Sequence, residues 1–235
     1  MTGKVSSIQS LAALDGPGVR FAVFLAGCNL RCGYCHNPET QTQDGAKEYT
    51  AEALFKMAER YREYFGKDGG ITLSGGEPLL QARFAREVFT LAKNAGINTC
   101  LDTSGTVINE EVEALLSKTD RVLLDIKFTS EEQYKEYTGG SLDAVLRFLD
   151  LLFEKGIKTT VRQVIIPTLN DSKESLLRLK SLTRGYTTID SFEFLPFKKM
   201  CKTKYDNLGI PFIFDTYREP TEEEMKEVND YFFSL

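Results

Sequence analysis

Residues 19–38 read VRFAVFLAGCNLRCGYCHNP, and this stretch decides how the rest of the chain is interpreted. Its first seven residues, VRFAVFL, form a short apolar run that is typical of a buried strand. The loop that follows carries Cys28, Cys32 and Cys35 in a C-x3-C-x2-C spacing, and its glycines and Pro38 favour irregular backbone. The chain has no second cysteine pair that would close a tetrahedral zinc site. Three clustered thiolates therefore indicate an iron–sulfur cluster in which one iron stays open for another ligand.

The three cysteines also allow a zinc site or a purely structural role. His36 directly follows Cys35 and could complete a Cys3His zinc site, although adjacent residues rarely converge on one small ion. Alternatively, the cysteines are ordinary core or disulfide residues, but a glycine-containing loop is an unusual place for buried thiols, and nothing indicates an oxidising compartment. The remaining cysteines, Cys100 and Cys201, have no ligand pattern around them. An iron–sulfur cluster accounts for the spacing best.

Composition limits the class of protein. With 235 residues, 42% of them hydrophobic and 27% charged, the chain suits a globular fold, and we expect one domain over residues 1–235. The net charge of -5 argues against a sequence-independent nucleic-acid partner. No apolar run approaches the ~20 residues of a membrane span, and the N-terminus lacks a signal-peptide pattern. We therefore expect a cytoplasmic protein with no membrane partner, in a compartment where thiols stay reduced.

Short apolar runs alternate with helical patterns along the whole chain. The runs predict strands at residues 19–25, 71–73, 97–101, 121–126, 157–166 and 191–195. The helical patterns lie at residues 51–65, 84–95, 110–117, 142–155, 173–184 and 222–233. About six βα units indicate an α/β fold with a parallel sheet, and we predict an open (β/α)6 partial TIM barrel.

The informative loops follow the ends of the predicted strands, where parallel α/β folds bind ligands. They are SGGEP at residues 74–78, DTSG at 102–105 and DIK at 125–127. Glycines let the backbone approach a cofactor closely, and two aspartates aimed at one pocket suit a hydroxyl, an ammonium or a hard cation. A tight turn and helix caps are the ordinary alternatives. His36 is the only histidine, so no nucleophilic system with a second histidine exists.

Together these motifs resemble the radical S-adenosylmethionine superfamily, whose cysteine loop has an aromatic residue before the third cysteine, here Tyr34. More closely, the chain is similar to the glycyl-radical-enzyme activases, of the type that acts on pyruvate formate-lyase. The matching segments run in order over nearly the whole length: DGPGVRF, GCNLRCGYCHNPET, SGGEPLLQ, TCLDTSG, LLDIK, VRQVIIP and FLPF.

The resemblance implies a mechanism. Cys28, Cys32 and Cys35 would hold a [4Fe–4S] cluster, and S-adenosylmethionine would chelate the open iron. One electron, from a flavodoxin or ferredoxin donor, would cleave the sulfonium to methionine and a 5′-deoxyadenosyl radical. That radical would take a hydrogen from a glycine of the partner, a glycyl radical enzyme such as pyruvate formate-lyase. The resemblance also implies a monomer.

It further assigns binding residues. Gly75, Gly76 and Glu77 would meet the methionine end, and Tyr34 and His36 would border the adenine. Arg162 is a further pocket candidate, and a monovalent cation, Na⁺ or K⁺, is expected at Asp102, Thr103 and Asp125. The full set expected to line the cofactor is Tyr34, Cys35, His36, Gly75, Gly76, Glu77, Asp125, Ile126, Lys127, Phe128, Thr129 and Lys198.

Two departures from the family pattern bear on the interpretation. Lys198 stands where the family example has a histidine, and a lysine cannot stack on adenine as an imidazole can. The chain also lacks the cysteine-rich insertion of activases for glycerol and choline eliminases, which favours the pyruvate formate-lyase type. An activase of another glycyl radical enzyme, a radical enzyme with a small-molecule substrate, and a non-catalytic zinc-binding interaction protein remain alternatives.

Overall fold

The computed structural model describes all 235 residues, which form two compact units. The first unit comprises Met1–Asn29 and Glu39–Leu124, and the second comprises Leu30–Pro38 and Asp125–Leu235. Cys28 therefore belongs to the first unit, whereas Cys32 and Cys35 belong to the second. The single domain expected over residues 1–235 stays a prediction.

Six strands form the sheet of the first unit, in the order β3-β1-β2-β4-β5-β6. Strands β2, β4, β5 and β6 run parallel, whereas β1 is antiparallel to both of its neighbours. The parallel strands are buried along nearly their whole length, as expected of a sheet that is covered on both faces. The bounds of all six strands are β1 (Thr2–Ala12), β2 (Arg20–Leu25), β3 (Lys47–Thr50), β4 (Gly70–Gly75), β5 (Asn98–Thr103) and β6 (Arg121–Asp125).

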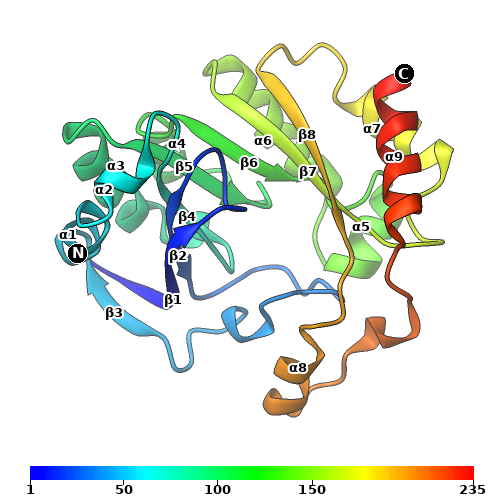
Figure 1. Ribbon diagram of the computed structural model, residues 1–235, viewed down its shortest axis with the longest axis horizontal. Coiled ribbons are helices and arrows are strands. Elements are labelled where there is room, and N and C mark those ends of the chain that lie inside the picture. The colour runs from blue at the N-terminus through cyan, green and yellow to red at the C-terminus, as the bar shows by residue number, and fades with distance from the viewer. The chain divides into compact units, whose positions relative to one another are not determined.

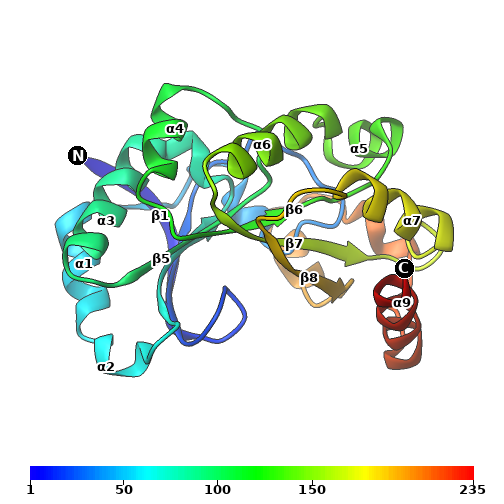
Figure 2. The ribbon, with the colours of Figure 1, turned by 90° about the horizontal axis from the view of Figure 1, so that it is seen from above.

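Helix α3 (Ala82–Asn94) is the central helix of the first unit, and it packs between α1 (Ala51–Glu59) and α4 (Glu110–Leu116) (Figures 1 and 2). It buries Phe84, Val88 and Phe89, which the helical repeat places on one face. The helix expected over residues 51–65 is instead divided into α1 and α2, because Tyr61 leaves helical geometry at φ -103° and ψ 8°. The remaining short helices are α2 (Arg62–Phe65), η1 (Pro38–Thr40) and η2 (Pro78–Gln81).

The DGPGVRF segment has a structural role at the start of β2. Arg20 is fully buried. Its Nε donates to Thr72 Oγ1 at 2.9 Å, its Nη1 to Asn98 Oδ1 at 2.9 Å, and its Nη2 to the carbonyl of Ile71 at 2.8 Å. Gly18 has φ +68°, and a Cβ there would lie 2.5 Å from a backbone nitrogen of the neighbouring turn. The motif thus ties the β2 entry to β4 and β5.

In the second unit, β7 (Lys158–Ile165) and β8 (Ile189–Pro196) pair in parallel. Helix α9 (Glu222–Ser234) packs against α7 (Lys173–Leu182) and β8, and both views show α7 and α9 side by side (Figures 1 and 2). The ring centroid of Phe232 lies 4.8 Å and 4.9 Å from those of two β8 phenylalanines. The other elements are α5 (Glu131–Thr138), α6 (Leu142–Glu154), α8 (Lys202–Leu208) and η3 (Ile213–Thr216).

The α/β class with parallel strands in an open sheet is confirmed. Four elements escape the sequence patterns: β1, β3, α5 and α8. β1 carries the polar run SSIQS, and α5 is polar around most of its circumference, burying only Tyr134 and Thr138. No helix of the chain combines the length and the apolar character that crossing a membrane demands.

Candidate cofactor site

The glycine-rich turn after β4 folds against the backbone at the start of the cysteine loop. Gly76 N donates to the carbonyl of Leu25, and Glu77 N donates to the carbonyl of Gly27, both at 2.8 Å. A Cβ on Gly76 would lie 2.3 Å from the Gly27 oxygen, and one on Gly75 would lie 2.4 Å from Leu25 backbone atoms. Both positions therefore require glycine, and the turn presents bare backbone as the sequence predicts.

The carboxylate of Glu77 accepts its hydrogen bonds from other groups of the protein. It is fully buried, and its Oε1 accepts from Thr103 Oγ1 at 2.5 Å and from Leu79 N at 3.1 Å. Its Oε2 accepts from Ser104 N at 3.0 Å and from the Ser104 hydroxyl. These donors occupy its four acceptor positions. The carboxylate thus joins the SGGEP turn to the DTSG loop. The backbone of Glu77 is engaged as well, since its N–H donates to the carbonyl of Gly27 at 2.8 Å and its own carbonyl accepts from Leu80 N at 3.1 Å.

Asp102 lies at the end of the neighbouring strand β5. Its Oδ2 accepts from the hydroxyl of Ser74 at 2.7 Å, and its side chain is half-buried. The structure therefore brings the loops after β4 and β5 together, as the parallel sheet predicts. Ser74 and Ser104, which complete this polar network, were not among the expected site residues; their positions inside SGGEP and DTSG were the available signal.

The cysteine loop of the second unit is held by the end of α5. Arg31 N donates to the carbonyl of Thr138 at 2.8 Å, and Gly33 N donates to that of Tyr137 at 2.9 Å. Within the loop, the backbone N–H of Cys35 bonds to the carbonyl of Cys32 at 3.1 Å. None of the five cysteines forms a disulfide; the three of the loop are half-buried, and the other two are buried.

Tyr34 lies between the second and third cysteines in the sequence and packs into an aromatic group. Its ring centroid lies 6.0 Å from that of Phe128 and 5.5 Å from that of Phe214. Its hydroxyl is buried without a hydrogen-bond partner, and burial raises the pKa of Tyr34 well above its usual value. An orphaned polar atom of this kind, beside a cysteine loop, fits a site that takes a polar ligand.

Asp125, Lys127 and Arg162 form a charged triad in the second unit. Arg162 Nε and Nη2 each lie 3.0 Å from Asp125 Oδ1, and Lys127 Nζ lies 3.1 Å from Oδ2. Burial opposes ionisation of Asp125, but Arg162 and Lys127 outweigh it and hold its pKa below the usual value. Burial likewise opposes the charge of Lys127, yet Asp125 and then Cys32 raise the pKa of Lys127 well above its usual value. The triad therefore keeps a net positive charge within electrostatic reach of Cys32.

The remaining expected residues are placed as follows. Ile126 and Phe128 are fully buried, and Thr129 shares a hydrogen bond of 3.1 Å with Ser175. Lys198 lies at the surface, where its Nζ pairs with Glu219 at 3.0 Å. Lys198 is therefore paired with a surface carboxylate, whereas the side chains of Ile126 and Phe128, which follow β6, pack in the interior. Their contacts with a cofactor stay predictions, as does the role of His36.

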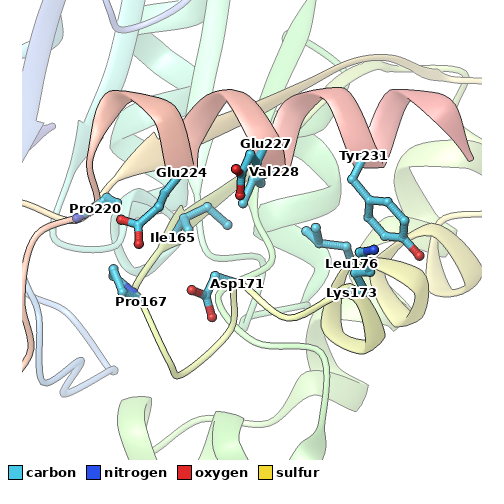
Figure 3. A pocket seen from close by; sticks show the side chains of 10 residues that line it. All are labelled: Ile165, Pro167, Asp171, Lys173, Leu176, Pro220, Glu224, Glu227, Val228 and Tyr231. Atoms are coloured by element: carbon cyan, nitrogen blue, oxygen red, sulfur yellow. The ribbon is translucent and has the colours of Figure 1, made fainter.

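A separate cavity of about 200 Å³ lies beside α9. Ile165, Leu176 and Val228 contribute apolar lining, and Figure 3 shows Asp171 and Glu224 on opposite walls. Its volume is below the ~300–1,000 Å³ of typical small-molecule sites. Glu224 is moreover paired with Arg218, at 2.7 Å. This cavity contains none of the expected site residues.

The model of the radical SAM superfamily matches residues 23–179. The pyruvate formate-lyase-activating enzyme of Clostridium pasteurianum is 39% identical over 234 residues, which cover 99% of this chain and 98% of that protein. The chain belongs to this radical SAM family of activating enzymes. The corresponding enzyme of Streptococcus mutans is 40% identical over 96% of this chain, and that of Escherichia coli K12 is 38% identical over 96%.

Solved structures share the fold of this chain. Streptococcus suis SuiB, bound to its precursor peptide SuiA, superimposes with a TM-score of 0.72 at 17% identity. The alignment covers 97% of this chain and 46% of SuiB. A domain of pyruvate-formate lyase-activating enzyme from Bacteroides vulgatus gives a TM-score of 0.58 at 17% identity, covering 71% of this chain and 94% of that domain. The open parallel-strand fold is thus that of the superfamily.

Proposed function

We propose that this radical SAM enzyme activates a glycyl radical enzyme, pyruvate formate-lyase in the first instance, by generating a radical on one of its glycines. The observation that carries the proposal is the C-x3-C-x2-C loop after β2, whose three cysteines form no disulfide. Support comes from 38–40% identity, over nearly the full chain, to proteins named for that activation.

The type and number of the thiol donors support the cofactor that this chemistry needs. Cys28, Cys32 and Cys35 would hold three irons of a [4Fe–4S] cluster, and no fourth thiol follows in the loop. When bound, the cluster and S-adenosylmethionine supply one-electron cleavage of the sulfonium and the radical that removes the glycine hydrogen. The protein's own task is to bind, orient and shield these groups.

Each set of residues contributes to that task. In the first unit, the turn of Gly75, Gly76 and Glu77 would meet the methionine end, because its two glycines have no side chain that would keep a cofactor from the backbone. In the second unit, the unpartnered Tyr34 hydroxyl and the cation of Lys127 would meet polar groups of the cofactor. The buried side chains of Ile126 and Phe128 would exclude water. The other expected contacts are His36, Thr129 and Lys198.

We assign a monovalent cation, Na⁺ or K⁺, to Asp102, Thr103 and Asp125. Asp102 and Thr103 end β5, and the carboxylate of Asp102 would supply the main oxygen ligand of the cation. Asp125 is already paired with Arg162 and Lys127, so it would bind the cation more weakly than Asp102 does. A cation here would offset the charge of the methionine carboxylate.

The partners follow from the chemistry. The electron would come from flavodoxin or ferredoxin, and the substrate would be a loop of the glycyl radical enzyme, bound transiently by a monomeric activase. Five cysteines without a disulfide suit the reducing cytoplasm.

The test combines reconstitution with spectroscopy. Anaerobic reconstitution should load about four irons per chain, the content of one [4Fe–4S] cluster, and single Cys28→Ala, Cys32→Ala or Cys35→Ala replacement should abolish loading. Cys100→Ala and Cys201→Ala are the matched controls and should keep the iron. Reduced enzyme, S-adenosylmethionine and pyruvate formate-lyase should then give a glycyl doublet in the electron paramagnetic resonance spectrum.

Each alternative has its own outcome. Cofactor cleavage without a doublet from any glycyl radical enzyme would point to a small-molecule substrate. Zinc bound in place of an iron–sulfur cluster would favour the interaction protein. Loss of iron in the Cys201→Ala variant would show that the ligands are misassigned.

A further inference from the structure

Helix α8 contacts the cysteine loop from far away in the sequence. The hydroxyl of Tyr205 donates to the backbone carbonyl of Cys35 at 3.0 Å, and Lys204 Nζ donates to Asn37 Oδ1 at 2.6 Å. Tyr205 is only 5% exposed. Two successive residues of one short helix thus bond to the segment that contains the third cysteine.

The position of the Tyr205 hydroxyl is set independently of the loop. Its ring packs against Phe212, with the centroids 4.8 Å apart, and Phe212 in turn stacks on Phe197 at 6.3 Å. The loop is fixed on its other side by α5, through the backbone N–H groups of residues 31 and 33. The packed aromatic rings therefore hold the Tyr205 hydroxyl in the position from which it donates to the carbonyl of Cys35.

We propose that Tyr205 is a positioning residue for the cluster ligand Cys35, and that Lys204 adds a positive charge beside the loop. The inference rests on the proposed function, since it requires a cluster on that cysteine. Hydrogen bonds and charge around the ligands of an iron–sulfur cluster set its reduction potential. A donor and a cation at this loop would favour the reduced, more negative cluster, and so ease the electron transfer that starts the reaction.

The first test is a potentiometric titration of the reconstituted cluster, followed by electron paramagnetic resonance. Tyr205→Phe keeps the ring but removes the hydroxyl, so it should retain its iron while its potential shifts to more negative values. Tyr186→Phe is the matched control, because its hydroxyl donates to Asp150 on α6, at 2.6 Å, and it should titrate like wild type.

Lys204→Met tests the charge and should shift the potential in the same direction. Its control is Lys202→Met on the same helix, since Lys202 bonds to Asp215 rather than to the cysteine loop. Wild-type potentials in both Tyr205→Phe and Lys204→Met would overturn the proposal. Lys204→Met also keeps the test decisive should Tyr205→Phe fold poorly.

The second test needs no cluster. In the iron-free protein, hydrogen exchange of a peptide covering residues 32–38 should be about fivefold to tenfold faster in Tyr205→Phe than in wild type, as for a lost hydrogen bond. Unchanged exchange would remove the positioning role. A wild-type protein that never loads iron would defeat the proposed function instead, so the two failures are distinguishable.

Discussion

Arg20 shows how one residue of a family-like motif can serve the fold rather than the chemistry. Its guanidinium is fully buried and donates to side chains and carbonyls of β4, β5 and the preceding turns. Burial lowers the pKa of Arg20 from its usual value, but an arginine stays charged at any physiological pH. Only the five donors of a planar fork can satisfy so many acceptors at once.

We therefore expect Arg20→Met to lower the free energy of unfolding by about 3–5 kcal/mol, because several buried acceptors would lose their donors. Urea denaturation followed by circular dichroism measures the change. Arg147→Met is the control, since Arg147 is an exposed partner of Asp143 on α6 and should cost less than about 0.5 kcal/mol. A loss of similar size in both variants would refute the role given to Arg20.

Asp125 carries the second prediction at this scale. Asp125→Ala would leave Arg162 and Lys127 without their shared counter-charge and would remove a proposed cation ligand. We expect binding of S-adenosylmethionine to weaken by at least ~1–3 kcal/mol, as for a lost charge-assisted contact. Isothermal titration of the reconstituted protein measures this. Wild-type affinity in a folded variant would exclude Asp125 from the site.

At the scale of elements, α9 begins with a capping box whose strength depends on the ionisation of Glu224. Thr221 caps the first turn, and Glu224 accepts from Thr221 N at 2.9 Å and from Arg218 Nη1 at 2.7 Å. The hydrogen bonds from Arg218 and then from Thr221 lower the pKa of Glu224 from 4.5 to about 2. A carboxyl with a depressed pKa stabilises the folded state above its unfolded pKa and loses that contribution as pH falls through the folded pKa.

The stability of wild type should therefore decrease between pH about 4.5 and about 2 in part through Glu224, and Glu224→Gln should remove that part. Melting temperatures measured across this window for both proteins give the difference. Glu222→Gln, also in the first turn of α9, is the control. Parallel wild-type and Glu224→Gln curves would contradict the assignment.

At the scale of the whole molecule, a cluster bound at the cysteine loop would contribute to stability. Residues 30–38, with two of the three expected ligands, pack with Asp125–Leu235, so a ligand bound to them stabilises the folded form. A ligand that binds only the native state raises the melting temperature by mass action.

Removing the iron with a chelator under air should thus lower the melting temperature of the reconstituted wild type, by about 2–4 °C for each kcal/mol of binding lost. Differential scanning calorimetry before and after chelation provides the measurement. Cys28→Ala, which should load no cluster, must show no such change. Equal melting temperatures of loaded and stripped wild type would count against a cluster bound by the folded chain.

The sequence alone determined the class of fold and the family of the chain, whereas the site residues that it indicates stay predictions. Apolar periodicity and loop position depend on local order along the chain, so the parallel strands, their helices and the cysteine, SGGEP and DTSG loops were predictable. Only the tertiary structure decided what those side chains do. The carboxylate of Glu77 accepts hydrogen bonds from Thr103 and Ser104. The hydroxyl of Tyr205 donates to the carbonyl of Cys35, which lies 170 positions away in the chain. Hydrogen bonds between segments so distant depend on packing in space, which no local pattern encodes. The same holds for the short helices α5 and α8, whose contacts with the cysteine loop come from residues far away in the sequence.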